Sequence, residues 1–462
     1  MKDIALVTPC YFGRDGVGNS IRDYLAALEH WRWSASIYHE QQGLNTEKVK
    51  SHCCRAEEIL QELLSLDYAR ESGFPNHSFY LYQFVFYYPL LETVRSIDSG
   101  KVIFEYHGIT PPKFFLDEDP YKAKALDIMN RHDLLDYGDA VVVHSKSMES
   151  ELRDIWSVPK ERVHVIPLGV DSKFTPGVPD KELERTFPPP SSPLLLYVGR
   201  LSGNKRVPML IEMLGKLKRL YPNAQLIVLG AHDRTTCESY WEHCKKVIEE
   251  EDLFDSVHFL SNVNDDELPK YYRMASLYVS ASVHEGFGLP IAEAMACGTP
   301  CVVANVSASP ETMGDGGLTF LADSVEDMTQ KVAEALKPKK REKLSQNALE
   351  RVEMYRPKAF RKRLASLFER VAQQERRKRP ILGRRKALLD FAQQSRFFYE
   401  EKNTEGLWSR LLFWFRRKAT LPFEVSLLRK QRNKQALVND SIQKELESLK
   451  EELKALKKFS PP

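Results

Sequence analysis

Short apolar runs alternate with helix-like stretches along the first part of the chain. The first run, residues 4–8, is followed by a glycine-containing loop and by helical periodicity over residues 20–30. Runs that are apolar on both faces, with helical segments between them, are typical of parallel strands in a sheet that helices cover on both sides. We therefore predict strands at residues 4–8, 102–106, 140–143 and 163–166.

The pattern stops in a linker and then starts again. Residues 174–193 are rich in proline and charge and end in Pro188-Pro189-Pro190-Ser191-Ser192-Pro193, through which neither a helix nor a central strand can run. Two successive doubly wound α/β domains are predicted, over residues 1–178 and 193–375, with a ligand cleft at their junction. The second has predicted strands at residues 194–198, 225–229, 257–260, 277–280 and 300–304.

The character of the chain changes again after about residue 373. Residues 375–386 are strongly basic, and the aromatic-rich segment 407–415 is followed by Arg416-Arg417-Lys418. From residue 428 a charged helix carries an a/d seam of two to three heptads. We predict a basic helical extension over residues 376–462 with a short coiled coil. Segment 407–418 is either an extra helix packed on the protein or a peripheral membrane contact, and segment 428–458 either self-associates, which we favour, or is a single solvated helix.

Composition narrows the class of protein. A chain of 462 residues with 42% hydrophobic and 28% charged residues is long enough for two or three folding units. Its formal net charge of +3 gives no argument for nucleic acid. The seven cysteines show no disulfide spacing, which indicates a reducing compartment. The apolar run at residues 4–7 is too short for a signal peptide, and nowhere are 18 consecutive residues apolar. We therefore expect a cytoplasmic protein without a transmembrane helix, peripheral on the inner face of the membrane if segment 407–418 contacts lipid.

The segment from His284 to Pro300 carries the strongest chemical signal. A strand is predicted to end near Ser280, Pro290 falls in a first helical turn, and Gly298 falls where that helix ends. Loop amides at a helix N-terminus form an anion site suited to a diphosphate. Glu285 and Glu293 lie on either side of this loop, so that both can face the same ligand.

Two other strand ends carry candidate binding residues. Gly199 lets the chain turn after the strand at 194–198, and Arg200 and Lys205 can then both reach the cleft. A fixed cationic pair suits a diphosphate leaving group, whose charge grows as the sugar bond breaks. Gly16 and Gly18 follow the first strand, at a position for close backbone approach to a phosphate or sugar, although turns of this kind are common.

Taken together, these motifs resemble the retaining glycosyltransferases of family four, the Glu-x7-Glu glycosyl transferases of group 1. The resemblance rests on the Glu285…Glu293 segment, the Gly199-Arg200…Lys205 element, the glycine loop after the first strand, and the run Val165-Ile166-Pro167-Leu168-Gly169-Val170-Asp171. It covers roughly residues 1–375. Residues 106–112, Tyr-His-Gly-Ile-Thr-Pro-Pro, are similar to a subgroup with a His-x-Ile-Thr-Pro run. The family has the GT-B fold of two facing Rossmann-like domains.

The resemblance implies a role for each position. Glu285 would lie beside the donor sugar and Glu293 would hold the ribose hydroxyls. Arg200 and Lys205 would clamp the diphosphate, with His107 near the reacting centre. Backbone contacts to the donor would come from Gly286, Phe287, Gly288 and Leu289, with close approach at Gly16 and Gly18 and with Val263 in the region of the base.

The resemblance also implies a reaction. The family transfers a sugar with retention and generally without a metal ion, and no Asp-x-Asp motif stands at a strand end here. We expect no cofactor, a nucleotide-sugar donor such as GDP-mannose or a UDP-hexose, and a saccharide or lipid-linked saccharide acceptor, in the assembly of surface polysaccharide or lipopolysaccharide. Two departures stand out: Arg206 replaces the usual glycine after the lysine, and Asp15 replaces the first glycine of the more common loop.

Other functions fit the sequence less well. A GT-B epimerase or phosphorylase is disfavoured by the Arg200…Lys205 pair combined with the two glutamates, and a phosphorylase would be much longer. The alternative from another class is a catalytically weak scaffold that organises a glycan assembly complex through its C-terminal tail. The presence of all four charged residues argues against that alternative.

Overall fold

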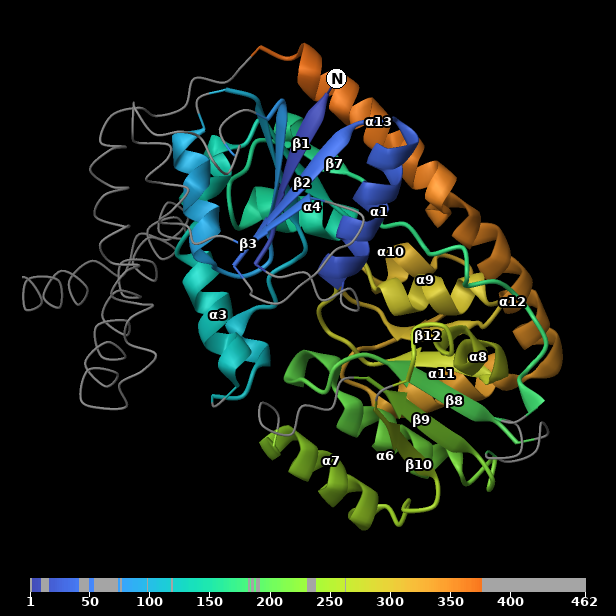
Figure 1. Ribbon diagram of the computed structural model, residues 1–462. Coiled ribbons are helices and arrows are strands. Elements are labelled where there is room, and N and C mark those ends of the chain that lie inside the picture. Colours follow the sequence, from blue (N-terminus) through green and yellow to red (C-terminus); the bar gives the residue numbers. More distant parts are fainter. Residues whose placement is uncertain are drawn as a thin grey trace, which may run out of the picture. The chain divides into compact units, whose positions relative to one another are not determined.

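Two parallel β-sheets with helices on both faces form the described part of the protein (Figure 1). The computed structural model describes residues 2–9, 16–40, 50–53, 74, 77–97, 99–117, 119–181, 183, 187, 192–230, 238–261 and 263–375. The chain divides into two compact units, residues 1–397 and 398–462, and all described residues belong to the first. The predicted extension 376–462, with segments 407–418 and 428–458, therefore lies outside the described residues, as does Asp15.

The first sheet has seven parallel strands in the order β3-β2-β1-β4-β5-β6-β7. The order reverses between β1 and β4, which places the carboxyl ends of the central strands at a position where ligands bind in such sheets. The strands are β1 (Asp3–Val7), β2 (Ser34–His39), β3 (Lys50–Cys53), β4 (Phe79–Phe84), β5 (Lys101–Tyr106), β6 (Ala140–Val143) and β7 (Val163–Val165).

Alternate residues of this sheet face two separate cores. Ile4 and Leu6 of β1 pack with Ile21 and Tyr24 of α1, whereas Ala5 and Val7 pack on the other side with 3-10 and α helices. Period-two burial of a nearly all-apolar strand is what a sheet covered on both faces requires. The helical segments are α1 (Gly16–His30), η2 (Pro89–Ser96), η3 (Pro112–Phe114), α3 (Pro120–Met129), η4 (His132–Tyr137), α4 (Lys146–Asp154) and η5 (Lys160–Arg162).

The second sheet has six parallel strands in the order β10-β9-β8-β11-β12-β13. One face packs against α6, α7 and α11, and the other against α8, α9 and α12. The strands are β8 (Leu194–Val198), β9 (Gln225–Leu229), β10 (Val257–Leu260), β11 (Leu277–Ser280), β12 (Cys301–Ala304) and β13 (Gly317–Phe320). The helical segments are η6 (Gly203–Lys205), α6 (Val207–Leu217), α7 (Glu238–Glu250), α8 (Leu268–Met274), α9 (Leu289–Ala296), α10 (Ser309–Met313), α11 (Val325–Leu336), α12 (Pro338–Val352), η7 (Glu353–Tyr355) and α13 (Pro357–Gln373).

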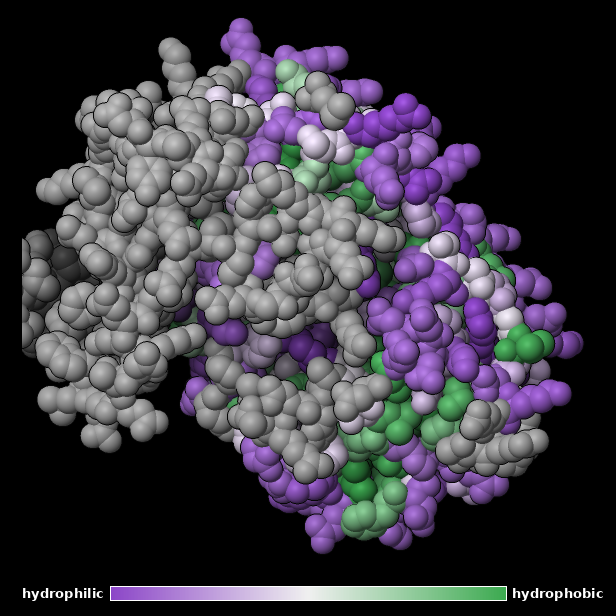
Figure 2. All heavy atoms as spheres, viewed as in Figure 1, coloured by the Kyte–Doolittle hydropathy of each residue, from purple (hydrophilic) through white to green (hydrophobic). Residues whose placement is uncertain are grey.

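The last described helix, α13, packs on the first sheet rather than on the second. Its residues Phe360, Leu364 and Phe368 are buried in the core that contains Ile4 and Tyr24. The Phe368 ring lies edge-on to Phe79 and Trp33, with centroid distances of 5.1 and 5.2 Å. Figure 1 shows α13 (orange) alongside α1, and Figure 2 shows that largely hydrophilic side chains cover the outward side of α12 and α13. The chain thus crosses back to the first half after building the second.

The sequence predictions of the fold are confirmed in type. Two doubly wound parallel sheets follow one another, and every predicted strand is present within one residue at each end. Four strands lacked a clear signal in the sequence: β2, β3, β4 and β13. In the part of the chain that the structure describes, no helix combines the length and the apolar character needed to cross a bilayer.

Candidate functional site

Lys205 and Glu285 meet directly although 80 residues separate them. The Lys205 ammonium donates a hydrogen bond of 2.5 Å to Glu285 Oε1, and the two side chains are only 16% and 18% exposed. Burial alone would raise the pKa of the Glu285 carboxyl, but the Lys205 charge and hydrogen bond hold that pKa below its ordinary value. Glu285 is therefore an ionised carboxylate with a fixed cation beside it.

The loop that carries Glu285 is anchored by hydroxyl groups from the following segments. The Glu285 amide donates to Ser307 Oγ (3.1 Å), and Ser307 Oγ donates to the Glu285 carbonyl (2.8 Å). Thr312 Oγ1 donates to the Phe287 carbonyl at 2.5 Å. Ser307 and Thr312 carried no sequence signal, because serine and threonine in helices and loops are common. Together they hold the main chain of residues 285–287 in one conformation.

The helix after this loop begins and ends as the sequence predicts. Gly288 is its N-cap with φ of 84°, a left-handed conformation that favours glycine, and Pro290 lies in the first turn of α9. Gly298, with φ of 83°, follows the helix. The amides of residues 286–289 thus stand at the positive end of α9, where an anion is favoured.

Glu293 occupies a different environment from Glu285. It is 7% exposed, and the Tyr272 hydroxyl donates to its Oε2 at 2.8 Å. Burial raises the pKa of Glu293 to about 7. The charges of both Glu285 and Glu293 raise the pKa of the buried Tyr278, which places the two carboxylates on either side of that phenol. The two glutamates therefore face one region of the protein in different protonation states.

The region predicted to meet the base is bound to the first half by ion pairs. Val263 is half-buried. Two residues further on, Asp265 pairs with Arg22 Nη1 of α1 (3.5 Å) and with Lys173 Nζ (3.6 Å). The Lys173 and Asp265 charges also act on Glu293. This links the position predicted for the base with the one predicted for the ribose.

His107 is brought to the glycine loop by close backbone contact. A Cβ atom on Gly286 would lie 2.3 Å from the His107 carbonyl oxygen, so only glycine fits there. Gly108 has φ of 82°, and its Cβ position is 3.3 Å from Gly286 Cα. Ser145 Oγ at the start of α4 donates to the Gly286 carbonyl at 2.9 Å. The structure thus brings together Lys205, Glu285, Gly286 and His107.

Arg200 stands apart from the Lys205–Glu285 pair. It is exposed, and its guanidinium carbon lies 4.5 Å from the ring centroid of Tyr121 in α3. This distance is typical of a cation–π contact. The contact of Arg200 with a diphosphate stays a prediction. Tyr121 is an addition that the sequence did not indicate, since it lies in the other half of the chain.

A second network of polar groups joins the two halves. His284 Nε2 lies 3.3 Å from Glu151 Oε2 of α4, and its Nδ1 lies 3.3 Å from Thr110 Oγ1. Tyr106 donates a short hydrogen bond to the same Glu151. The network therefore ties the residue before Glu285 to the Tyr-His-Gly-Ile-Thr segment. Sequence spacing could not reveal it, because its partners are 133 and 174 residues apart.

The predicted glycine loop of the first half is only partly described. Gly16 is the first residue of α1, and a Cβ atom there would meet no described atom within 4 Å. Gly18 is buried in the same helix. Close approach of a ligand at Gly16 and Gly18 stays a prediction.

Three side chains of the first half could hold a metal ion by type and proximity. Candidate ligand atoms of Glu105, His107 and His144 all lie within 4.8 Å of one another. His107 Nε2 and the Glu105 oxygens already take part in hydrogen bonds with Gln83 and Ser20. The cluster is therefore internally bonded, and its role is taken up below.

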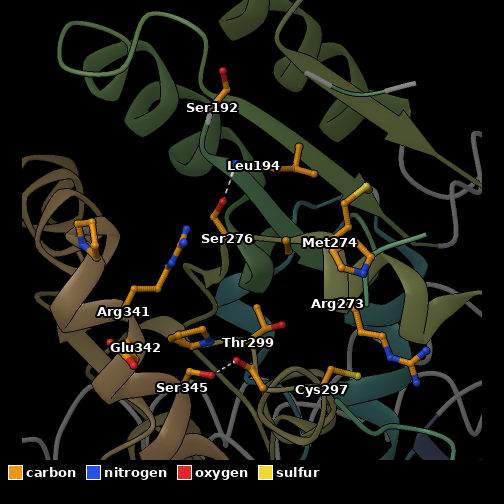
Figure 3. A pocket seen from close by; sticks show the side chains of 15 residues that line it. Ser192, Leu194, Arg273, Met274, Ser276, Cys297, Thr299, Arg341, Glu342 and Ser345 are labelled. Carbon is orange, nitrogen blue, oxygen red and sulfur yellow. Dashed lines mark hydrogen bonds between the residues drawn. The ribbon is translucent and has the colours of Figure 1, made fainter. Parts of the chain in front are cut away.

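A separate hollow lies at the opposite, amino edge of the second sheet (Figure 3). It has a volume of about 510 Å³, and Arg273, Cys297, Arg341 and Glu342 are among its lining residues. Burial raises the pKa of the Cys297 thiol to about 12, so this thiol is not a reactive nucleophile. None of the predicted site residues lines this hollow.

Similarity to curated proteins is found mainly in the second half. The chain is 27% identical over 234 residues to the O-antigen chain mannosyltransferase B of Escherichia coli, covering 50% of this chain and 57% of that protein. It is 34% identical over 180 residues to the D-inositol 3-phosphate glycosyltransferase of Xylanimonas cellulosilytica, covering 36% of this chain and 41% of the relative. The chain thus spans about half the length of the curated relatives it matches.

Solved structures match a larger part of the chain. Sucrose-phosphate synthase from Thermosynechococcus elongatus gives a TM-score of 0.67 at 20% identity, covering 80% of this chain and 99% of that one. The Anabaena protein HepE, in complex with UDP and glucose, gives 0.64 at 15% identity, covering 80% and 100%. At these identities the likeness shows the fold, and it confirms the predicted GT-B architecture.

Two family descriptions match adjacent parts of the chain. Residues 78–174 match glycosyltransferase family 4, and residues 180–351 match the glycosyl transferases group 1. The first stretch holds His107, and the second holds Lys205, Glu285 and Glu293. With the two sheets and the site in the order that these matches require, the chain belongs to the family-4 glycosyltransferases of the GT-B fold.

Proposed function

We propose that this protein moves a hexose from a nucleotide-diphosphate sugar to a saccharide or lipid-linked saccharide acceptor, with retention of anomeric configuration and without a metal ion. The observation that carries the proposal is the Lys205–Glu285 pair at the N-terminal loop of α9, in contact with the His107 backbone through Gly286. A buried cation and helix-end amides are the groups that a diphosphate leaving group needs.

The chemistry assigned to these groups is electrostatic. As the bond between the anomeric carbon and the diphosphate oxygen breaks, negative charge grows on the diphosphate, and the Lys205 ammonium and the amides of residues 286–289 stabilise it. The acceptor oxygen attacks the same face of the sugar, and its proton passes to the departing diphosphate oxygen. Ionised Glu285 is placed to stabilise the positive charge that develops on the sugar ring.

Metal independence follows from the same charges. A divalent cation normally neutralises a transferring diphosphate. Here Lys205 occupies that position beside Glu285, and Arg200 can add a second cation after leaving Tyr121. We therefore propose that chelation of divalent ions leaves transfer unchanged.

Donor, acceptor and pathway are proposed from the relatives. Mannosyltransferase and galactosyltransferase names occur among them, one for an O-antigen chain and one for the lipopolysaccharide outer core. HepE is seen with UDP and with UDP-glucose. These names support a hexose donor and a role in surface-polysaccharide assembly on the cytoplasmic side of the membrane, with either GDP-mannose or a UDP-hexose as donor.

Substitution at the pair tests the activity. A panel of nucleotide-sugars is first screened by thermal shift, since a ligand of the folded state raises its apparent stability. Transfer is then measured for Lys205→Ala and Glu285→Gln, and we expect losses of at least about a hundredfold with a folded protein. The exposed residues Lys343 and Glu350 of α12 provide matched controls, because Lys343→Ala and Glu350→Gln make the same chemical changes away from the site. Wild-type transfer by either site variant would refute the proposal.

A further inference from the structure

Glu105 is a fully buried carboxylate at the centre of the first half. It lies in β5, two residues before His107, with no measurable exposure. Ser20 Oγ of α1 lies 2.7 Å from both of its oxygens, and Gln83 Nε2 at the end of β4 donates to Oε2 at 2.6 Å. One carboxylate thus joins the helix after the glycine loop to the ends of two central strands.

This carboxylate is ionised despite its burial. Burial raises the pKa of Glu105, but the imidazoles of His107 and His144 and the Ser20 hydroxyl outweigh it and lower the pKa to about 2. An ionised carboxylate in the protein interior is stable only with hydrogen-bond donors or a cation beside it. The groups that supply this stabilisation are therefore held close to it.

His144 is a poor candidate for the compensating cation. Its Nδ1 lies 3.0 Å from the Ile166 carbonyl, to which only an N–H can donate. Burial lowers the pKa of His144 to about 4, so the ring is neutral at physiological pH. Its Nε2, 3.4 Å from Glu105 Oε1, then carries a lone pair and donates nothing. His107, with Nε2 3.6 Å from Glu105 Oε2, is left as the group that responds to the carboxylate charge.

Gln83 determines which nitrogen of His107 carries hydrogen. Because its amide nitrogen donates to Glu105, its amide oxygen faces His107 Nε2, with which it makes a short hydrogen bond. An oxygen acceptor requires an N–H at Nε2. The neutral ring therefore has its lone pair on Nδ1, which is the nitrogen that remains for a ligand.

We propose that Glu105, acting through Gln83, is a positioning residue that fixes His107 with hydrogen on Nε2, so that Nδ1 accepts a hydrogen bond from a hydroxyl group of a bound sugar. This inference rests on the proposed function for the identity of the ligand, but not for the state of the ring. A carboxylate that fixes the tautomer of a histidine and stabilises its protonated form is an arrangement with known energetic consequences.

The titratable groups that surround Glu105 come from three elements. Asp23 and Tyr24 lie in α1, His107 follows β5 and His144 follows β6, and each acts electrostatically on Glu105 or is acted on by it. Removal of the Glu105 charge takes away an attraction on the His107 ring that these other groups do not replace. Protonation of His107 must then require a lower pH.

Nitrogen NMR of histidine-labelled full-length protein tests the inference without any activity. The His107 signals are assigned by their loss in His107→Gln. We expect the pattern of a ring with hydrogen on Nε2 in the wild type, and a titration midpoint that falls by about one pH unit or more in Glu105→Gln. In Gln83→Leu we expect the preference for Nε2–H to weaken. Ser20→Ala removes a donor to Glu105 that does not touch His107, and it should change neither quantity.

The contradicting results are equally defined. Hydrogen on Nδ1 of the wild-type ring, or an unmoved midpoint in folded Glu105→Gln, would overturn the inference. If that variant does not fold, Gln83→Leu decides alone, because an unaltered tautomer there is incompatible with the relay. One equivalent of tightly bound metal in the purified protein, lost in His144→Ala, would also overturn it, since Glu105 would then be a metal ligand. Absence of transfer with every donor, together with the expected NMR result, would refute the proposed function and leave the positioning role standing.

Discussion

Arg206 occupies a backbone conformation that suits glycine. Its φ of 51° and ψ of 43° are left-handed, at the N-cap of α6 directly after Lys205. The family resemblance leads one to expect glycine here, and the left-handed conformation is the physical reason. The Arg206 guanidinium reaches back to the Ala322 carbonyl and to Asp323, both within 3.0 Å. These contacts offset part of a strain that for a non-glycine residue is about 1–2 kcal/mol.

Two substitutions at Arg206 separate strain from charge. Arg206→Gly and Arg206→Ala both remove the guanidinium contacts, but only glycine also relieves the left-handed conformation. We expect Arg206→Gly to be more stable than Arg206→Ala by about 1 kcal/mol, measured by denaturant unfolding. Equal stability of the two variants would mean that this conformation costs nothing here.

Glu293 gives stability a defined pH dependence. Burial raises its pKa to about 7 in the folded protein, against an ordinary value of 4.5. The stabilising contribution of the protonated form is complete below pH 4.5 and is lost as the pH rises through 7.

Glutamine imitates the protonated carboxyl at every pH. Glu293→Gln should therefore match the wild type near pH 5.5 and exceed it at pH 8.5 by roughly 1–3 kcal/mol, since one pKa unit corresponds to about 1.4 kcal/mol. Unfolding of both proteins without nucleotide, at both pH values, measures the difference. A gap that is the same at both pH values would show that Glu293 does not titrate in this range.

At the scale of elements, the sequence is informative where strands are continuously apolar. β6, β8, β9 and β11 were predicted with their observed bounds. β2 (Ser-Ala-Ser-Ile-Tyr-His), β4 (Phe-Tyr-Leu-Tyr-Gln-Phe) and β13 (Gly-Leu-Thr-Phe) mix polar or aromatic residues with apolar ones. In β4 the tyrosines and Gln83 are buried because their polar ends find partners that local periodicity cannot show.

The site divides in the same way. Glu285, Glu293 and the glycine loop of α9 lie close together in the chain and were found from spacing. The pairing of Lys205 with Glu285 followed from the topology of a parallel sheet, which brings carboxyl ends of strands to one edge. Ser307, Glu151 and Glu105 act through partners that are 22 to 133 residues distant, and no short motif marks them.

Gly286 is the element junction most sensitive to added volume. An alanine methyl group would lie 2.3 Å from the His107 carbonyl oxygen, so the loop or the strand end must move. We expect Gly286→Ala to reduce transfer by more than about tenfold, because shifts of about 1 Å misplace reacting groups. Gly215→Ala in α6 is the control, since its methyl group meets the flexible end of Glu251 and the helix gains propensity. Equal rates for Gly286→Ala and the wild type would mean that the close contact has no bearing on transfer.

On the scale of the whole molecule, the described contacts between the halves converge on the glycine loop and its surroundings. Ser145 bonds the Gly286 carbonyl, and the Glu311 carboxylate of α10 accepts the Lys146 amide at 2.8 Å, at the N-terminus of α4. A carboxylate at a helix N-terminus is a favourable pairing. The first half thus contributes His107 and α4 to a donor site whose charged groups come from the second half. The account depends on a nucleoside diphosphate binding at this junction.

A crystal structure of the protein soaked with a nucleoside diphosphate from the thermal-shift panel tests that dependence most directly. The account predicts diphosphate oxygens within hydrogen-bond distance of Lys205 Nζ and of the amides of residues 286–289, with the ribose hydroxyls on Glu293. A nucleotide bound elsewhere, for instance in the hollow near Arg341, with Lys205 still paired only to Glu285, would contradict it.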